Sequence, residues 1–122
     1  MDKPILNLVV IRSKDINRSA EFYSTIGLHL DKHQHGSGPE HFTYEHGASV
    51  FEIYPRQGEN DSTSEVRIGF QVTSVDNVIE NLMRIGATIV SVPKNSPWGR
   101  RAVIKDIDGH RVELTQPSKE AG

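Results

Sequence analysis

Apolar and polar residues follow two different periods along this chain, and the two periods alternate. Residues 66–72 carry apolar side chains at every second position, which is the pattern of a half-buried β-strand. Residues 75–83 repeat apolar side chains three and four positions apart, which predicts an amphipathic helix ending at Gly86. Further strands are predicted over 87–92, before a loop at Pro93 and Pro97, and on both sides of the turn at 106–109. The second half of the chain therefore predicts a βαβββ unit.

The first half of the chain shows the same order of elements. Asp15 is the predicted N-cap of a helix that ends at Gly27. Four strands are predicted around this helix, over residues 5–11, 28–34, 40–45 and 49–54. Residues 56–65 contain no apolar side chain, so this segment is expected to be a surface linker between two similar units.

Residues with matching expected roles recur about sixty positions apart, which supports an internal duplication. The matching pairs are Asp15 and Asp76, Gly27 and Gly86, Glu52 and Glu113, and Asn7 and Arg67. The length of 122 residues allows one hydrophobic core. We therefore expect an α+β fold in a single domain over 1–122, with one module at about 4–55, a linker at 56–65 and a second module at about 66–117.

In each expected module the helix covers one face of the sheet and leaves the other face free to line a cavity. If Leu6, Leu8 and Val10 face the helix, Asn7 shares the opposite face with Val9 and Ile11. The same alternation in the other strands places Glu52, Arg67 and Glu113 on the cavity side. This predicts a polar cavity that contains two carboxylates and one guanidinium.

Composition excludes several classes of function. A net charge of −2 and a pI near 6.3 give no basic surface for nucleic acid. The absence of cysteine rules out a thiolate nucleophile and a cysteine-ligated zinc site. No stretch reaches membrane-spanning length, and the N-terminal apolar run is too short for a secretion signal. We therefore expect a cytoplasmic protein without a membrane partner. Phosphate-binding loops and the GxSxG and HExxH motifs are also missing.

Two segments carry a family resemblance, namely the opening NLVVIRSKDINRSAEFYSTIGL and the ending WGRRAVIKDIDGHRVEL. Together they resemble the vicinal oxygen chelate superfamily, which includes glyoxalase I, bleomycin-resistance proteins, fosfomycin-resistance enzymes and extradiol dioxygenases. The resemblance covers nearly the whole chain, and the closing DxDGxxVEL segment is its most specific part. It implies two βαβββ modules around an open barrel-like cavity, and usually a homodimer. In glyoxalase I-like members it also implies a divalent metal, bound by a His or Gln on each module's first strand and a Glu on each last strand.

Transferred to this sequence, the resemblance places the two last-strand ligands at Glu52 and Glu113. The first-strand positions fall on Asn7, or Leu8 if the strand has no bulge, and on Arg67. A guanidinium is permanently protonated and has no lone pair for a metal. A metal cofactor such as zinc or nickel is therefore disfavoured by Arg67 and Asn7, and we expect none.

Three arrangements of these charges remain open. Arg67 can form an ion pair with Glu113, Glu52 or both, in place of the metal. Alternatively, Arg67 lies at the cavity rim while Glu113 pairs with Arg111 or Arg101. A metal with fewer ligands than usual is the third arrangement.

Other candidate ligand-binding residues are aromatic or basic. Trp98 either covers an edge of the core or forms a wall of the pocket. Arg100 and Arg101 point to opposite faces, so at most one of them contacts an anionic group of a ligand, and we select Arg101. Tyr54 is added as aromatic lining of the pocket, and His41 because the strand that carries it lies in the cavity-forming sheet.

The remaining histidines are expected at the surface. His33, His35 and His41 make a three-histidine metal site conceivable, but the surrounding DKHQHGSGPEH is polar and rich in glycine, as in an exposed hairpin. His110 lies in the closing turn and is expected to face solvent.

These observations lead to two functional hypotheses. The favoured hypothesis is a homodimeric binding protein, similar to bleomycin-resistance proteins, that holds a small polar or anionic organic molecule without a catalytic metal. The alternative is an enzyme, either a metal-dependent glyoxalase I-like lyase or isomerase, or a metal-free enzyme with Glu52 or Glu113 as general base. A carboxylate held in an ion pair is a poor base, which favours binding over catalysis.

Overall fold

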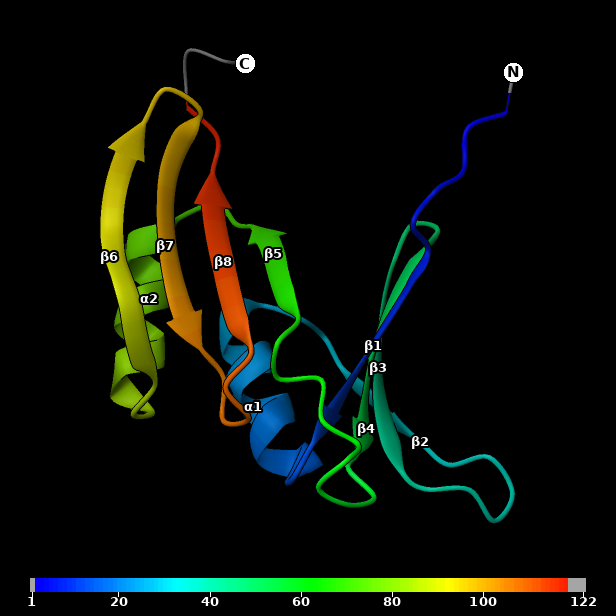
Figure 1. The fold of residues 1–122 in the computed structure, drawn as a ribbon. Helices are drawn as coiled ribbons and strands as arrows, with labels where there is room; N and C mark the ends of the chain where they lie inside the picture. The colour runs from blue at the N-terminus through cyan, green and yellow to red at the C-terminus, as the bar shows by residue number, and fades with distance from the viewer. Residues whose placement is uncertain (1, 119–122) are drawn as a thin grey trace.

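The structure is a computed structural model that describes residues 2–118, and it contains two modules with the same order of elements (Figure 1). As the sequence predicted, each module is a strand, a helix and three strands in an α+β fold. The elements are β1 (Leu8–Ser13), α1 (Ile16–Ile26), β2 (Asp31–His33), β3 (His41–His46), β4 (Ser49–Pro55), β5 (Arg67–Gln71), α2 (Val75–Arg84), β6 (Thr88–Ser96), β7 (Gly99–Lys105) and β8 (Arg111–Gln116).

Each module forms its own four-stranded mixed sheet. The strand orders are β1-β4-β3-β2 and β5-β8-β7-β6, so the first strand of each module pairs with the last. That pairing is parallel, while the remaining pairs are antiparallel. In Figure 1 the two sheets stand apart, with α2 behind the second sheet and α1 near the junction of the modules.

The ends of the helices explain why each helix starts and stops where it does. The side chain of Asp15 accepts a hydrogen bond from the backbone N–H of Arg18, and α1 ends at Gly27, whose φ of 126° favours glycine. In α2 the N-cap is Ser74, which accepts from the N–H of Asn77. The expectation that Asp76 matches Asp15 in its role is therefore wrong, because Asp15 is an N-cap whereas Asp76 lies inside the first turn of α2.

One hydrophobic core connects the two modules. Both helices contribute to it and contact each other, and each sheet turns one face toward them. The buried members are Ile11, Phe22, Tyr23, Ile26, Leu28, Phe51, Ile53, Val75, Ile79, Leu82, Ala102, Ile104, Val112 and Leu114. Because burial of one large apolar side chain contributes about 1.5–3 kcal/mol, this shared core fixes the helix-side face of both sheets.

The strand lengths differ from the prediction at two edges of the sheets. The strand expected over 28–34 is reduced to β2, whose three residues are all exposed. The strand expected over 87–92 continues to Ser96 and includes Pro93, where the sequence predicted a loop. β6 is an edge strand, and its register shifts between Ser91 and Lys94. Pro93 therefore lies where the regular hydrogen-bond ladder is already interrupted, and its missing N–H removes no regular strand-to-strand hydrogen bond.

Within the described range 2–118, none of the helices is both long enough and apolar enough to cross a bilayer.

Candidate functional site

The strand register decides which residues lie on the sheet face opposite the helices. In the first module Val9 pairs with Phe51 and Ile11 with Ile53, and all four pack toward the core. Glu52 therefore points to the opposite face. This corrects the expected orientation of the first strand, because Val9 and Ile11 face the helix side.

The first-strand position on the Glu52 face is consequently Leu8, not Asn7. Leu8 pairs with Val50 and is half-exposed. Asn7 precedes β1 and is itself exposed, and its carbonyl accepts a hydrogen bond of 2.8 Å from the N–H of Val50. The first-strand residue on this face is therefore a leucine, where the polar side chain of Asn7 was predicted.

Three predicted site residues meet on the open face of the first sheet. His41 Nε2 lies 3.8 Å from Glu52 Oε2, and the hydroxyl of Thr43 donates to the same carboxylate oxygen at 3.1 Å. The ring of His41 stacks on Tyr54 with 4.2 Å between centroids, and the guanidinium of Arg12 lies 5.3 Å from the Tyr54 centroid. The structure thus brings His41, Glu52 and Tyr54 together, as expected from their strands.

The second sheet carries the predicted arginines. Arg67 Nε lies 3.9 Å from Glu113 Oε2, and Arg101 forms a second, closer ion pair with Glu113. Two of the alternatives considered from the sequence therefore occur together. The side chains of Arg67 and Arg101 are 53% and 41% exposed, so solvent screens both pairs and each stabilises the fold by about 1 kcal/mol or less.

Arg100 and Arg101 point to opposite faces, as alternation predicted. Arg100 binds the carboxylate of Asp76 on α2 through two hydrogen bonds of 2.6 and 2.9 Å. The hydrogen bond from Arg100 lowers the pKa of Asp76 below its ordinary value. Arg101 is therefore the arginine that remains on the face of Glu113.

A groove of 450 Å³ lies beside the Arg101–Glu113 pair, and Trp98 forms one of its walls. Its lining consists of Ser96, Trp98, Gly99, Arg100, Arg101, Glu113 and Thr115. Trp98 is 86% exposed, so the alternative that it covers an edge of the core is wrong. An indole and a guanidinium on one groove can contact an aromatic body and an anionic group, respectively.

The metal site implied by the family resemblance does not fit these residues. Its first-strand ligands would be Leu8 and Arg67, and neither side chain has a lone pair to donate. In the second sheet, Glu113 pairs with the guanidiniums of Arg67 and Arg101. In the first sheet, Glu52 contacts Thr43 and lies close to His41. The described contacts therefore do not join the two glutamates into one metal site.

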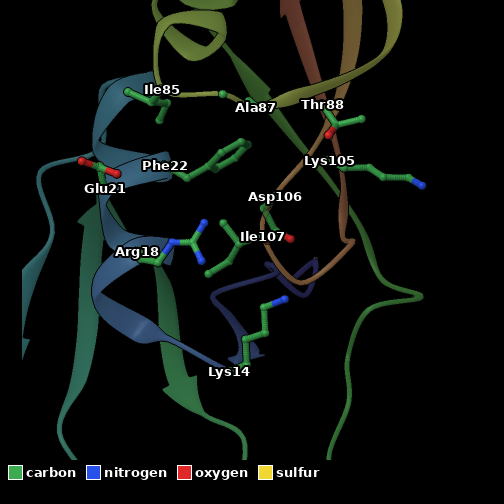
Figure 2. Close-up of a pocket in the computed structure, with 11 residues that line it drawn as sticks. Lys14, Arg18, Glu21, Phe22, Ile85, Ala87, Thr88, Lys105, Asp106 and Ile107 are labelled. Atoms are coloured by element: carbon green, nitrogen blue, oxygen red, sulfur yellow. The ribbon is translucent and has the colours of Figure 1, made fainter.

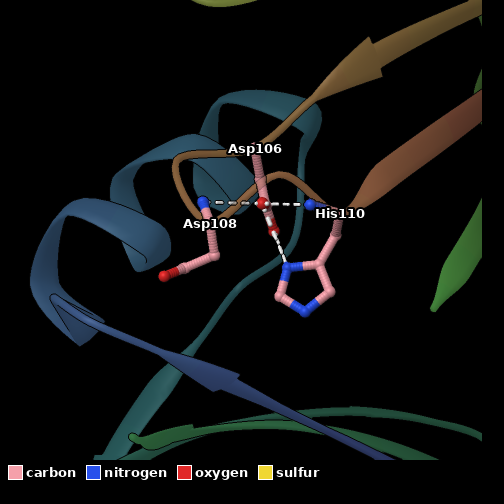
Figure 3. Close-up of side chains that lie close together, drawn as sticks. All are labelled: Asp106, Asp108 and His110. Atoms are coloured by element: carbon pink, nitrogen blue, oxygen red, sulfur yellow. Dashed lines mark hydrogen bonds and ion pairs between the residues drawn. The ribbon is translucent and has the colours of Figure 1, made fainter. Parts of the chain in front are cut away.

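A buried polar cluster at the junction of the modules was missed in the sequence analysis (Figure 3). One carboxylate oxygen of Asp106 accepts from the N–H groups of Asp108 and His110, at 2.9 and 3.0 Å. The other accepts from the hydroxyl of Tyr23 at 2.6 Å and from Nδ1 of His110 at 2.8 Å. His110 is fully buried, so the expectation that it faces solvent is wrong. The DxDG motif indicated a turn here, but nothing local in the sequence indicated the long-range contact with Tyr23.

The protonation of this cluster follows from its partners. Since a carboxylate only accepts, Nδ1 of His110 donates to Asp106. Nε2 of His110 lies 2.6 Å from the Thr63 hydroxyl oxygen, which accepts from the N–H of Arg12. Burial raises the pKa of the Asp106 carboxyl, but hydrogen bonds from His110 and Tyr23 outweigh it and leave this pKa below its ordinary value. Burial and the nearby Asp106 charge raise the pKa of Tyr23 well above its ordinary value.

Asp106, Asp108 and His110 also form a compact group of potential metal ligands, with ligand atoms within 4.8 Å of one another. The carboxylate of Asp106 already accepts four hydrogen bonds, and the ring of His110 is bonded at both nitrogens. The group is therefore accounted for by its role in joining α1, the linker and the turn between β7 and β8.

A cleft of 250 Å³ adjoins this cluster and is lined by both modules (Figure 2). Figure 2 shows the side chains of Lys14 and Arg18 pointing toward Ile107, with Phe22 above them. None of the site residues predicted from the sequence lines this cleft.

Comparison with known proteins places this geometry in a family. The model of the Glyoxalase/Bleomycin resistance protein/Dioxygenase superfamily matches residues 5–114. TnmS3, an antibiotic-binding protein from Streptomyces sp. CB03234, has a similar structure with a TM-score of 0.76 and 24% identity, covering 97% of this chain and 99% of that one. A glyoxalase/bleomycin resistance protein/dioxygenase from Nocardioides has a TM-score of 0.66 and 18% identity, covering 98% of this chain and 87% of that one.

A sequence relative from Mycolicibacterium smegmatis, described as an uncharacterized protein, is 25% identical over 114 residues, covering 93% of this chain and 95% of the relative. The family match spans both modules, from before β1 into β8. The duplicated βαβββ topology and the closing DxDGxxVEL segment agree with it. The chain belongs to the glyoxalase/bleomycin resistance protein/dioxygenase superfamily.

Proposed function

We propose that this protein binds a small anionic organic molecule and does not use the family's divalent metal to do so. Arg67 and Arg101 contact the anionic group, while Trp98 packs against the body of the ligand. Tyr54 and His41, which lie on the sheet of the first module, provide aromatic contacts. The observation that supports this most is the groove beside the Arg101–Glu113 pair, because it combines an exposed indole with a guanidinium.

The charge of the second sheet favours an anionic ligand. By alternation and register, Arg67, Arg101, Lys105 and Arg111 share the open face with Glu113. The strands thus place four cationic side chains and one glutamate on this face, and the excess positive charge attracts anions to it. A bound carboxylate or phosphate can pair with Arg101 without leaving Glu113 unpaired, because Arg67 remains beside it.

One structural relative supports the proposal that the ligand is an organic molecule. TnmS3 is described as an antibiotic-binding protein, and its fold is similar over nearly the whole of both chains. Binding of an organic molecule is therefore compatible with this arrangement of two sheets. Which groups the ligand carries is inferred from the residues of this chain alone.

We further propose that the protein is a homodimer, in which the first sheet of one copy faces the second sheet of the other. The open face of the first sheet carries Asp31, Glu45 and Glu52 against the single cation Arg12. This acidic face complements the basic face of the second sheet. Such pairing encloses the ligand between residues of both copies.

The residues around Glu52 and Glu113 do not favour the lyase or isomerase alternative. It requires a metal or an available base between Glu52 and Glu113, and the chain supplies Leu8 and Arg67 at the remaining ligand positions. Glu113 is paired with two guanidiniums, those of Arg67 and Arg101. No contact of the described residues favours catalysis over binding.

Trp98 is the single tryptophan of the chain, so its fluorescence reports directly on the groove. Biphenyl-4-carboxylate is a suitable probe, because it combines an aromatic body with one carboxylate. We expect saturable quenching that weakens about tenfold in Arg101→Gln, corresponding to about 1.4 kcal/mol for one charged contact. Arg84→Gln, at an exposed arginine on α2, is the matched control and should bind as the wild type does. Equal binding by both variants would contradict the proposed role of Arg101.

A further inference from the structure

Three histidine rings gather at the β2–β3 edge of the first sheet. His33 and His41 are direct cross-strand partners, with 6.1 Å between ring centroids. His35 follows β2 and lies 6.1 Å from His33 and 5.3 Å from His41, again between centroids. Imidazole is a good ligand for zinc, copper and nickel. The cluster therefore carries the right donor atoms for a transition metal, and it lies outside the groove at Trp98 and Arg101.

The geometry of His41 leaves one ring nitrogen without a hydrogen bond. Its Nδ1 lies 3.3 Å from the carbonyl oxygen of Pro39, which can only accept, so Nδ1 carries the proton. In the neutral ring, Nε2 then presents a lone pair toward Glu52 Oε2 at 3.8 Å, too far for a hydrogen bond. The ring is only 2% exposed. A buried lone pair and a carboxylate thus face each other, which is a favourable arrangement for a cation.

We propose that the three histidines, together with Glu52, bind one divalent late first-row transition metal such as Zn²⁺ or Ni²⁺. Metal–nitrogen and metal–oxygen bonds of roughly 2.1 Å in a tetrahedral site separate two ligand atoms by about 3.4 Å. The observed 3.8 Å between His41 Nε2 and Glu52 Oε2 is close to that value. His41 and Glu52 therefore form the fixed half of the site.

His33 and His35 form the mobile half. Both side chains are exposed and their only recorded contacts are with other imidazole rings, so their rings can turn at low cost. In a tetrahedral site with three histidines, ring centroids lie about 5 Å apart. The observed separations of 5.3 to 6.1 Å are larger, so the rings of His33 and His35 must turn toward His41 before their nitrogens can reach one ion.

This site differs from the metal site that the family resemblance implies. It is built within one module, from the second, third and fourth strands, and needs no ligand from β1 or β5. Leu8 and Arg67, which disfavour the other site, do not take part. The proposed organic ligand depends chiefly on Arg101 and Trp98 in the second module, and His41 is the residue that both proposals share.

The test is isothermal titration calorimetry of the full, tag-free chain with ZnCl₂ or NiCl₂ alone at pH 7.5. We expect one ion per chain, with affinity at least about tenfold weaker in the double variant His33→Ala, His35→Ala. The control is the double variant His29→Ala, His46→Ala, which removes two exposed histidines outside the cluster and should leave the affinity unchanged. Absence of stoichiometric binding, or equal weakening in the control, would overturn the proposal.

A second measurement identifies the ligand atoms without relying on a buried substitution. In ¹⁵N spectra of the histidine rings, Zn²⁺ should shift Nε2 of His41 while Nδ1 keeps its proton. Binding should be lost at pH 5.5, where protons compete for the imidazoles. An unshifted Nε2 of His41 at saturating Zn²⁺ would overturn the assignment.

Discussion

The hydrogen bond between Tyr23 and Asp106 gives a direct test of how the two modules are held together. It joins α1 to the turn before β8, with 2.6 Å between the hydroxyl and Asp106 Oδ2. Tyr23→Phe removes this hydroxyl and leaves the ring in contact with Phe22, Phe51 and Phe70. The substitution therefore isolates one buried, charge-assisted hydrogen bond.

The expected loss can be worked out from the remaining contacts. A hydrogen bond to a charged group contributes about 1.5–3 kcal/mol, and Asp106 Oδ2 keeps its bond from His110 in the variant. For a domain of this size, 1 kcal/mol corresponds to about 3–6 °C in Tm, so Tyr23→Phe should lower Tm by about 5–15 °C. Tyr44→Phe is the matched control, since the structure records no hydrogen bond for that half-buried hydroxyl, and it should change stability by less than about 0.5 kcal/mol.

The effect should also depend on pH with a definite sign. The pKa of Asp106 is lowered in the folded state, so its contribution is present above the ordinary value near 3.9 and is lost as pH falls through the folded pKa. Tyr23→Phe removes one cause of that lowering. Urea unfolding should therefore show the full difference between wild type and variant at pH 7 and a smaller one at pH 3. A Tyr23→Phe variant as stable as Tyr44→Phe at pH 7 would show that the hydrogen bond from Tyr23 to Asp106 does not stabilise the fold.

Two further predictions concern the second module and the assembly. Gly99→Ala should destabilise the fold by about 3 kcal/mol or more in urea unfolding, because φ is 128° and a Cβ would collide with the carbonyl of Gln116; Gly58→Ala, where nothing lies within 4 Å, should be nearly neutral. In light scattering the protein should be a dimer. Because its facing sheets are oppositely charged, the dimer should dissociate more readily in 1 M NaCl, and at low salt the Glu52→Gln dimer should be weaker than the wild-type dimer. A monomer at low salt, or a dimer insensitive to salt, would contradict this arrangement.

Much of the fold could be predicted because it depends on local periodicity. The order of elements in both modules, the N-cap at Asp15 and the helix end at Gly27 all followed from neighbouring residues. The opposite directions of Arg100 and Arg101 also followed, since alternation within a strand is a local property. These features need no knowledge of how distant segments pack.

The errors arose where distant segments decide the outcome. The orientation of β1 was inverted because its apolar run is hydrophobic on both faces, and only the pairing of Ile11 with Ile53 fixes which face is buried. His110 was expected in solvent because its turn is polar, yet partners from α1 and the linker enclose it. Within the candidate site, the approach of Arg101 to Glu113 was only one of several pairings that the sequence allowed.

We propose that the guanidinium of Arg101, in place of a metal, recognises an anionic ligand beside Trp98. The most direct measurement is a calorimetric comparison of biphenyl-4-carboxylate with biphenyl-4-carboxamide, which differ in charge and hardly in shape. We expect the wild-type protein to bind the carboxylate at least about tenfold more tightly, and Arg101→Gln to reduce this preference. Equal affinity for the two probes, or a preference that survives in Arg101→Gln, would contradict this proposal.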